Sequence, residues 1–193
     1  FGYLGALGAV PISLNGGIGY NVLSVDDISR PDASYLLSDT RLRVTETNFL
    51  SFGADFGYDN IQSIDITCGN GNNVVAITGT SSDIDPNNQV TILMNGGQDS
   101  AYIYPRNAAG ELTINGNIGI SGGNDVDTMT IEDAASTSPI NYTISNPFGA
   151  GTQSVFGLGT RGLGTGTLEN YFIHAGSGND TFNVNQFKSG VGA

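Results

Sequence analysis

The chain has 193 residues, 29 of them glycine, and only 12% of its residues are charged. Its 18 acidic and 6 basic side chains give a net charge of −12, which argues against nucleic acid or an anionic membrane as a partner. The single cysteine, Cys68, excludes an internal disulfide framework, and no window has the apolar period of a helix, so the composition predicts an all-β chain.

In chain order, residues 1–10 are apolar but include no basic residue, and they are too few to cross a bilayer. We therefore expect a processed or excerpted segment without membrane insertion. Period-two alternation of apolar residues then predicts a series of short strands. These are expected at residues 22–25, 61–66, 74–77, 90–93, 101–104, 112–114, 128–131, 171–173 and 181–184. The Pro/Asn stretch 82–88 and the Gly run 157–166 are predicted to be loops.

Two long stretches of the chain are variants of one pattern. Leu14–Gly17 matches Ile120–Gly123, 106 residues later, and after one inserted residue Tyr35 matches Tyr142. Repeated units stack to bury a face that none could bury alone. We therefore predict a single domain over 1–193, built of two degenerate repeats at about 10–78 and 116–185 with a pair of coils between them.

A shorter period lies inside the long one. Gly-rich turns that precede alternating apolar residues recur at one or two multiples of about 27 residues. The residues that mark these turns are Asn21, Asn73, Ser100, Asp127 and Asp180. A unit of this size matches one coil of a parallel β-helix with a triangular section, so we predict a β-solenoid of about seven coils, about four to each long repeat. The alternative is a β-sandwich, which also joins short strands by tight turns.

The sharpest local motif is Ala-Gly-Ser-Gly-Asn-Asp-Thr-Phe at residues 175–182. It resembles the nonapeptide of calcium-binding RTX β-rolls, in which Asp and backbone carbonyls bind calcium. The resemblance implies candidate calcium ligands at Asp180, Asp127 and Asp125. Neutral residues replace the Asp in three other turns, and this would weaken such a site. The alternative is a stacked ladder of Asn and Asp side chains that bond to neighbouring backbone.

The residue pattern indicates no catalytic residue and no organic cofactor. Paired acids at 26–27 and 132–133 could do acid/base chemistry, but their repetition at strand exits is typical of solvated turns. The six basic residues are scattered along the chain, which disfavours a polysaccharide lyase. His174 is the only histidine, so a His-rich metal site is excluded, and Cys68 is expected to fill a small site in a turn.

The Asn-Gly-Gly and Gly-Ser-Gly-Asn-Asp turns, the acid pairs after strands and the tyrosine strands together resemble the repeat arrays of large bacterial surface proteins, adhesins and hemolysin-type calcium-binding proteins. The resemblance implies an extracellular or cell-surface location and a structural or adhesive role. Because uncapped solenoid ends expose pairing edges, we predict head-to-tail self-association into a filament or surface assembly.

Two other functions stay open. A calcium-dependent module that binds carbohydrate would use exposed tyrosines as stacking platforms. The candidates are Tyr3, Tyr20, Tyr102, Tyr104 and Tyr171. The third function is a polysaccharide-active β-helix enzyme, which would require a cluster of charged catalytic groups.

Overall fold

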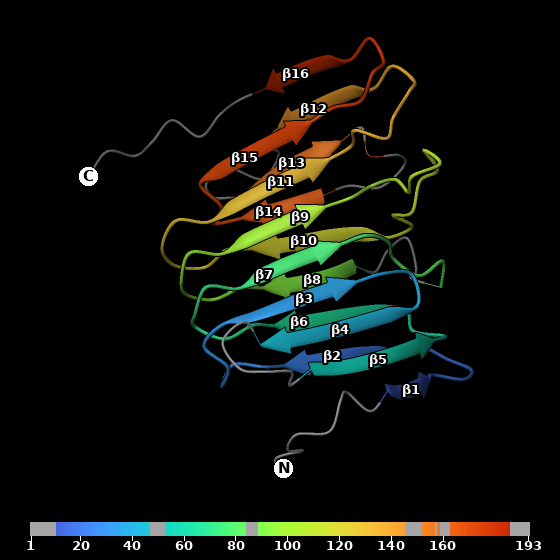
Figure 1. The fold of residues 1–193 in the computed structure, drawn as a ribbon, viewed down its shortest axis with the longest axis vertical. Helices are drawn as coiled ribbons and strands as arrows, with labels where there is room; N and C mark the ends of the chain where they lie inside the picture. Colours follow the sequence, from blue (N-terminus) through green and yellow to red (C-terminus); the bar gives the residue numbers. More distant parts are fainter. Residues whose placement is uncertain are drawn as a thin grey trace.

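The computed structural model describes residues 11–46, 53–83, 89–145, 152–156, 158 and 163–185. Within these ranges the chain is all-β, as its composition predicts, with sixteen strands and no helix (Figure 1). The described residues accordingly offer no long apolar helix that could span a membrane.

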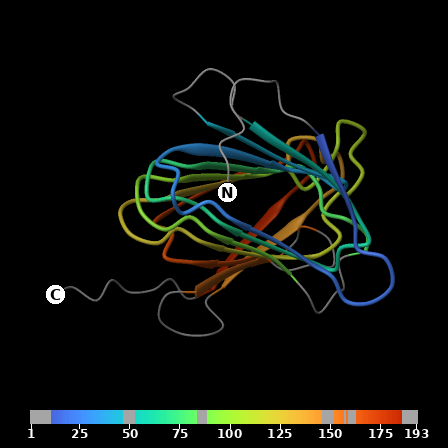
Figure 2. The same ribbon diagram turned by 90° about the horizontal axis from the view of Figure 1, so that it is seen from below.

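The strands form two open sheets of eight strands that face each other (Figures 1 and 2). The order of sheet A is β1(Pro11–Asn15), β5(Gly53–Asp59), β4(Arg41–Glu46), β3(Ala33–Leu37), β7(Val74–Ile77), β9(Ser100–Ile103), β11(Thr128–Glu132) and β15(Asn170–His174). The order of sheet B, from the same end, is β2(Val22–Asp26), β6(Ser63–Thr67), β8(Gln89–Leu93), β10(Asn117–Ser121), β14(Leu163–Gly166), β13(Thr152–Phe156), β12(Asn141–Ser145) and β16(Thr181–Asn185). Two layers thus replace the predicted triangular section.

Most neighbouring strands are parallel although they are far apart in the sequence. From β6 to β11, paired residues are 26 or 28 positions apart, close to the predicted period. In the other parallel pairs the separation is 40 to 45 residues. The longer separations arise because one extra antiparallel strand lies in the chain between the paired strands. This extra strand is β4 in sheet A and β13 in sheet B. A period near 27 residues therefore holds only in the middle of the chain.

The core lies between the two sheets and is filled by alternate residues of each strand. Sheet B contributes buried β-branched side chains such as Ile64 and Ile92, and sheet A contributes Ile77 and Ile103. The alternation follows from strand geometry, because successive side chains point to opposite faces. Leu93, the neighbour of Ile92 on β8, points outward and is 43% exposed.

The two long repeats make the same contacts in opposite sheets. The hydroxyl of Tyr35 on β3 donates to Asp27, and that of Tyr142 on β12 donates to Asp133. Strand β3 lies in sheet A, whereas its counterpart β12 lies in sheet B. From β1 to its counterpart β10 the chain changes sheet seven times, and an odd number of crossings exchanges the sheets. The long repeat is therefore three and a half coils, and not the four that its length suggested.

Two assignments made from the sequence are wrong. Residues 112–114 form no strand, and Leu112 makes only an isolated bridge to Arg106. Leu163–Gly166, within the predicted Gly loop, is strand β14, in which Leu163 and Thr165 are buried. Glycine at alternate positions hid the strand pattern, because the outward side chains that would mark it are missing.

We predict that Ile92→Ala lowers the free energy of unfolding by about 2–5 kcal/mol, because it leaves a cavity between the two sheets. Leu93→Ala removes as many carbon atoms from the outer face of the same strand and should cost less than about 1 kcal/mol. Urea unfolding of both variants checks the prediction. Equal losses would mean that β8 does not separate a core face from a solvent face as described.

Candidate functional site

A line of side chains connects the turns that lead into the strands of sheet A. The backbone N–H of Ala33 donates to Asn73 Oδ1 (3.2 Å), and that of Asn73 donates to Asp99 Oδ1 (2.6 Å). The N–H of Asp99 donates to Asp127 Oδ1 (2.8 Å), and that of Asp127 to Glu169 Oε2 (2.8 Å). We call Asn73, Asp99, Asp127 and Glu169 the turn ladder.

The turn ladder confirms the alternative prediction of a stacked ladder of Asn and Asp side chains that bond to neighbouring backbone. One member of the ladder is a residue earlier than predicted. Asp99, and not the predicted Ser100, occupies the position equivalent to Asn73 and Asp127. The strand register supports this, because Val74 pairs with Ser100 and Ser100 with Thr128, each directly after a ladder residue. Each ladder residue directly precedes the first residue of a strand, and this constant position is the signal that the sequence analysis missed.

Amides and carboxyl groups are not equivalent in these turns. Asn73 Nδ2 donates to the carbonyls of Gly69 (3.0 Å) and Gly71 (2.8 Å), so every polar atom of its side chain is bonded. Asp99 Oδ2 and Asp127 Oδ2 are buried and have no hydrogen-bond partner. Burial raises the pKa of Asp99 to about 7, and burial also raises the pKa of Asp127.

The three predicted calcium ligands have different surroundings. Asp125 is exposed and accepts from the N–H of Gly97 (3.2 Å), whereas Asp127 is fully buried in the turn ladder. Asp180 accepts from the N–H of Ile140 (2.9 Å) in the turn before β16 of sheet B. Because Asp127 precedes a strand of the opposite sheet, Asp180 lies at the other lateral edge of the molecule.

The positions of the three predicted calcium ligands do not bring all of them together. Among the residues that the structure describes, no three His, Cys, Asp or Glu side chains are grouped so that they could hold a metal. Asp125 and Asp127 are near neighbours, but Asp180 cannot join them. Calcium binding by this chain therefore stays a prediction that rests on the resemblance of the turn motif.

Each acid pair after a strand is divided between solvent and core. Asp26 is exposed, whereas Asp27 is buried and accepts from the Tyr35 hydroxyl (2.9 Å). In the second repeat, Glu132 faces outward to His174 Nδ1 (2.9 Å), and Asp133 is fully buried. Since the two acids of a pair point to opposite sides, they do not form the paired carboxylates that acid/base catalysis requires.

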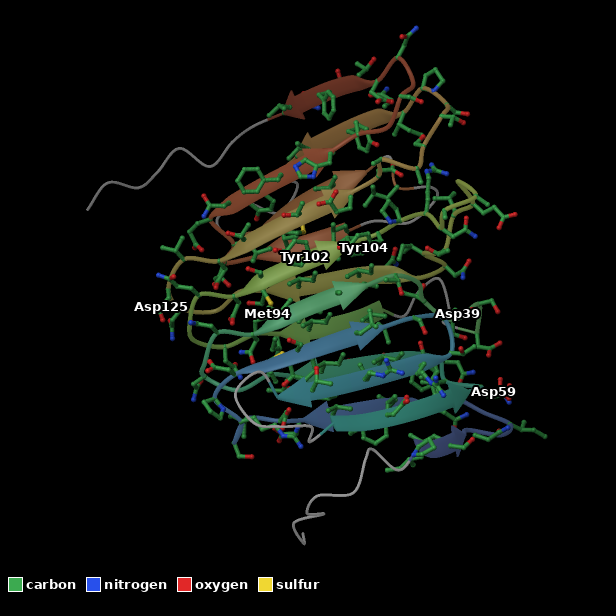
Figure 3. All side chains as sticks on the ribbon, in the orientation of Figure 1. Asp39, Asp59, Met94, Tyr102, Tyr104 and Asp125 are labelled. Atoms are coloured by element: carbon green, nitrogen blue, oxygen red, sulfur yellow. The ribbon has the colours of Figure 1, made fainter. Side chains whose placement is uncertain are left out.

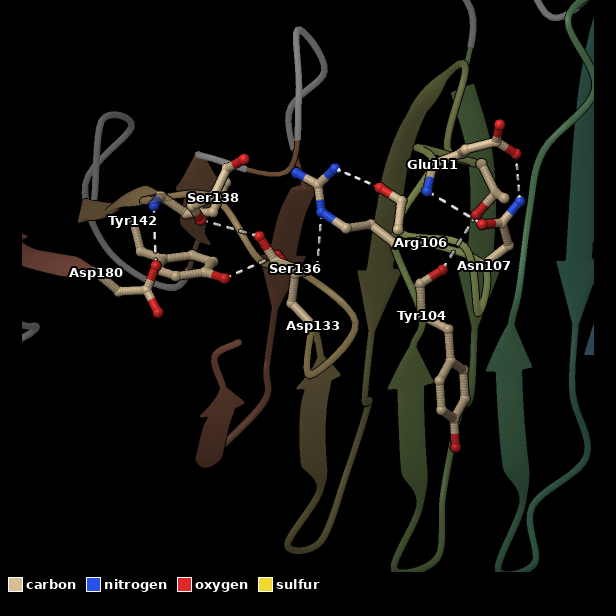
Figure 4. Close-up of polar contacts among 12 residues, drawn as sticks. Tyr104, Arg106, Asn107, Glu111, Asp133, Ser136, Ser138, Tyr142 and Asp180 are labelled. Carbon is tan, nitrogen blue, oxygen red and sulfur yellow. Dashed lines mark hydrogen bonds and ion pairs between the residues drawn. The ribbon is translucent and has the colours of Figure 1, made fainter. Parts of the chain in front are cut away.

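The buried acids are balanced by arginines from different places in the sequence. Arg30 Nε lies 2.8 Å from Asp27, three residues before it, whereas Arg106 Nε lies 3.0 Å from Asp133 and comes from the loop after β9 (Figure 4). Both clusters add a tyrosine hydroxyl, and burial raises the pKa of Tyr35 and of Tyr142. These are structural clusters, in which charge and hydrogen bonds offset the cost of burying a carboxylate.

Aromatic side chains are found on the outer face of sheet A. The register places Tyr102, Thr130 and Phe172 side by side on β9, β11 and β15, and Phe172 is 52% exposed. Tyr104 follows β9 on the same side of the molecule (Figure 3). Tyr171 points inward instead, its hydroxyl 2.9 Å from that of Thr165, so it is no stacking platform.

The remaining residues singled out from the sequence are Tyr20, Tyr3 and Cys68. Tyr20 is exposed in the turn before β2, and Tyr3 lies outside the described residues. Cys68 is buried, and burial raises the pKa of its thiol to about 12, so it fills a turn site as expected.

The two ends of the stack present the outermost strands. At one end β16 is exposed at all five positions, and the ring of Phe182 stacks on Tyr142 with its other face open. At the other end, Ile12 on β1 is 42% exposed although it points to the core side, opposite Phe56. Apolar side chains that would be buried in the middle of the stack are therefore accessible at both ends.

Comparison with protein families, with characterised proteins and with solved structures gave no match.

We predict that Arg106→Met lowers the free energy of unfolding by about 3–5 kcal/mol, because it leaves the buried Asp133 without its counter-charge. Arg30→Met is the matched control. The side chain of Arg30 is 32% exposed against 13% for Arg106, so water can replace part of its interaction and the loss should be smaller. Thermal and urea unfolding at pH 7 measure both, and equal losses would contradict the prediction.

Proposed function

We propose that this chain is a non-enzymatic, extracellular or cell-surface structural module. Its strands wind as a flattened β-solenoid, and its two ends associate head to tail with further copies to form a filament or surface assembly. The resemblance to surface-protein repeat arrays suggested the location. The strand directions at the two ends support the mode of association.

The observation that carries the proposal is that the edge strands at the two ends of the stack run in matching directions. Strands β1 and β15 bound sheet A, and β2 and β16 bound sheet B. Each sheet includes two antiparallel steps, which cancel, so β1 is parallel to β15 and β2 to β16. A second copy moved along the stack would continue both sheets at once with parallel pairs, at the usual strand spacing of about 4.8 Å.

Apolar contacts would accompany this pairing. Phe182 and Val184 on β16 of sheet B point to the core side and are 49% and 47% exposed, and at the other end Ile12 on β1 of sheet A points to the core side and is 42% exposed. Burying them against another copy removes apolar surface from water, and open edge strands are known templates for association. Because each end offers a different surface, the contact is heterologous and does not close.

The titratable groups support a structural role over catalysis. Asp27 and Asp133 are engaged with tyrosine and arginine, and Glu132 is paired with His174. Arg41 and Arg43 both contact Asp55, at 3.0 and 3.4 Å. These side chains are occupied by partners within the chain, and a hydrolase or lyase would need an acid and a base directed at a substrate.

Two complementary variants test the association. Ile12→Asp places a carboxylate at the β1 end, and Val184→Asp places one at the β16 end. Each alone should raise the concentration needed for assembly by more than about a hundredfold, because the charge would be buried unpaired at the junction. Mixed in equal amounts, the two variants keep one intact junction and should form heterodimers and nothing longer. Analytical ultracentrifugation and negative-stain microscopy measure both outcomes.

The control is Leu93→Asp, an equally exposed apolar residue on the outer face of β8 in the middle of the stack, which should leave assembly unchanged. Dispersed monomers of the parent chain at all concentrations would exclude the proposal. Dimers formed by either single-end variant alone would show that like ends associate, which contradicts a head-to-tail contact.

A second candidate function, carbohydrate binding, is favoured by the aromatic pair Tyr102 and Phe172. They lie two strands apart on the outer face of sheet A, with Thr130 between them. Two strand spacings of about 4.8 Å place their backbones about 10 Å apart. Tyr102 is half-buried and Phe172 is 52% exposed, and accessible aromatic rings stack on the apolar faces of sugars.

We predict that Tyr102→Ala and Phe172→Ala each weaken retardation by a neutral polysaccharide at least about fivefold in affinity electrophoresis, because each removes a stacking surface. Tyr20→Ala is the control, since Tyr20 is exposed elsewhere. Parallel runs in calcium and in EDTA test whether calcium contributes. No retardation of the parent chain by a panel of neutral polysaccharides would exclude this candidate.

A further inference from the structure

One kind of hydrogen bond links successive turns, and it runs the same way along the stack at each step where it occurs. The N–H of a residue where a turn meets a strand donates to a side-chain oxygen of the equivalent residue one strand further along. We call these contacts turn bonds. In sheet A they are the bonds of the turn ladder, which run from β3 toward β15.

Sheet B has turn bonds with the same direction. The N–H of Asn21, before β2, donates to Gln62 Oε1 (2.8 Å), before β6. The N–H of Ile140, before β12, donates to Asp180 Oδ1 (2.9 Å), before β16 (Figure 4). Both bonds run from the β2 end toward the β16 end. A series of bonds with one direction leaves a donor without an acceptor at one end and an acceptor without a donor at the other.

Asp180 occupies the last position of this series in sheet B. Its Oδ1 accepts from the N–H of Ile140, and the N–H of Thr181 donates to the Ile140 carbonyl (2.9 Å). The turn of Asp127 makes the same two contacts with Asp99 and then donates the Asp127 N–H to the next turn. Among the residues that the structure describes, the N–H of Asp180 has no such acceptor. The β16 end therefore presents an unpaired backbone donor.

Asn21 occupies the first position of the series in sheet B. Its Nδ2 donates to the carbonyls of Gly19 in its own turn (3.1 Å) and of Asn60 in the next turn (3.1 Å). Asn73 has the same arrangement, in which Nδ2 donates to its own turn and to the next, and Oδ1 accepts from the turn before it. Asn21 Oδ1 lacks this last contact within the described chain, since no strand of sheet B lies beyond β2. The β2 end therefore presents an unpaired side-chain acceptor.

We propose that the turn bonds continue from one copy of the chain to the next, with the N–H of Asp180 donating to Asn21 Oδ1 of a second copy. This bond rests on the proposed head-to-tail association and names the residues that set its register. A second copy fits because each end offers the group that the other end lacks. Two like ends would bring two donors or two acceptors together and leave both without a partner.

The bond fixes how the two edge strands pair. Asn21 directly precedes β2 and Asp180 directly precedes β16, so the strands of the two copies begin opposite each other. The pairs that follow across the junction are Val22 with Thr181, Leu23 with Phe182, Ser24 with Asn183 and Val25 with Val184.

The orientation of the side chains supports this register independently. Leu23 faces the core side and is paired with Ile64 of β6, and Phe182 faces the core side and is paired with Tyr142 of β12. In the proposed register Leu23 meets Phe182, so one apolar row continues through the junction from Tyr142 to Ile64. A slip of one residue would set Phe182 opposite an outward-facing residue of β2.

Cysteine cross-linking tests the register. In the double variant Ser24→Cys/Asn183→Cys, the proposed register brings the two Cα atoms to about 4.8 Å across the junction, which suits a disulfide. The two positions lie at opposite ends of one copy, so a bond between them joins two copies. Mild oxidation should give a series of covalent oligomers on non-reducing electrophoresis. Cys68 does not compete, because it is buried and burial raises the pKa of its thiol.

The matched control is the double variant Ser24→Cys/Asn185→Cys. Asn185 is also exposed on β16 but lies two residues further along the strand, which places its Cα about 8 Å from position 24 of the second copy. A disulfide does not span this separation without backbone movement, so the yield of covalent oligomers should be at least about tenfold lower.

Hydrogen exchange tests the bond itself. Assembly should slow the exchange of the Asp180 amide at least about tenfold relative to the monomer, because its N–H gains an acceptor and leaves water. Val184→Asp, which blocks the junction, supplies the monomer. The Ile140 amide is the internal reference, since it is bonded within the chain and its exchange should change little.

The possible results distinguish a failure of the register from a failure of the association. A parent chain that stays monomeric would remove the head-to-tail contact and the proposed bond with it. Assemblies in which the first pair of cysteines cross-links no better than the control pair would keep the head-to-tail contact but overturn the bond and its register. Assemblies in which the Asp180 amide exchanges as fast as in the monomer would overturn the bond in the same way.

Discussion

Stacking one turn directly on another buries backbone N–H groups that the sheets themselves do not pair. The turns before β7, β9 and β11 of sheet A meet this constraint by one repeated bond, from the N–H of the last turn residue to a side-chain oxygen one strand further along. Short side chains with an oxygen close to the backbone suit this bond, as at Asn73, Asp99 and Asp127, whereas Glu169 makes it with a longer side chain. The same bond fixes the strand register, because a slip of one residue would remove the acceptor and turn core side chains toward solvent.

The two long repeats show which interactions the architecture retains. Tyrosine donates to a buried aspartate in both, although the tyrosines lie in different sheets. The arginine beside each aspartate, in contrast, comes from the same turn in one repeat and from the loop after the neighbouring strand β9 in the other. What recurs is a buried carboxylate neutralised by an arginine, and the arginine comes from a different place in the sequence in each repeat. This pattern is typical of a requirement imposed by burial itself.

The sequence was enough to predict an all-β chain, the long repeat and the Asn/Asp turns, because apolar alternation and turn residues are local signals. It was not enough to choose between a triangular coil and two facing sheets, since nothing local distinguishes a strand that crosses to the other sheet from one that turns back. Strand β14 was missed because Gly164 and Gly166 carry no side chain to mark the outer face. Asp99 was missed because a one-residue shift toward Ser100 fits the spacing equally well, and only the hydrogen bond tells them apart. Arg106 reaches Asp133 across 27 positions, which is one coil period, but the sequence does not show which side chains of adjacent coils form a pair.

The odd number of sheet crossings in the long repeat has a geometric consequence. A repeat that ends on the opposite sheet acts as a half-turn screw operation, so the second unit presents its equivalent surfaces on the other side of the molecule. In a longer array of such units, any feature displayed outward by one repeat would appear alternately on the two broad sides, with a true period of two repeats. Such an array would carry its binding or contact surfaces on both sides, and a short repeat sequence would be enough to give a symmetric, two-sided ribbon.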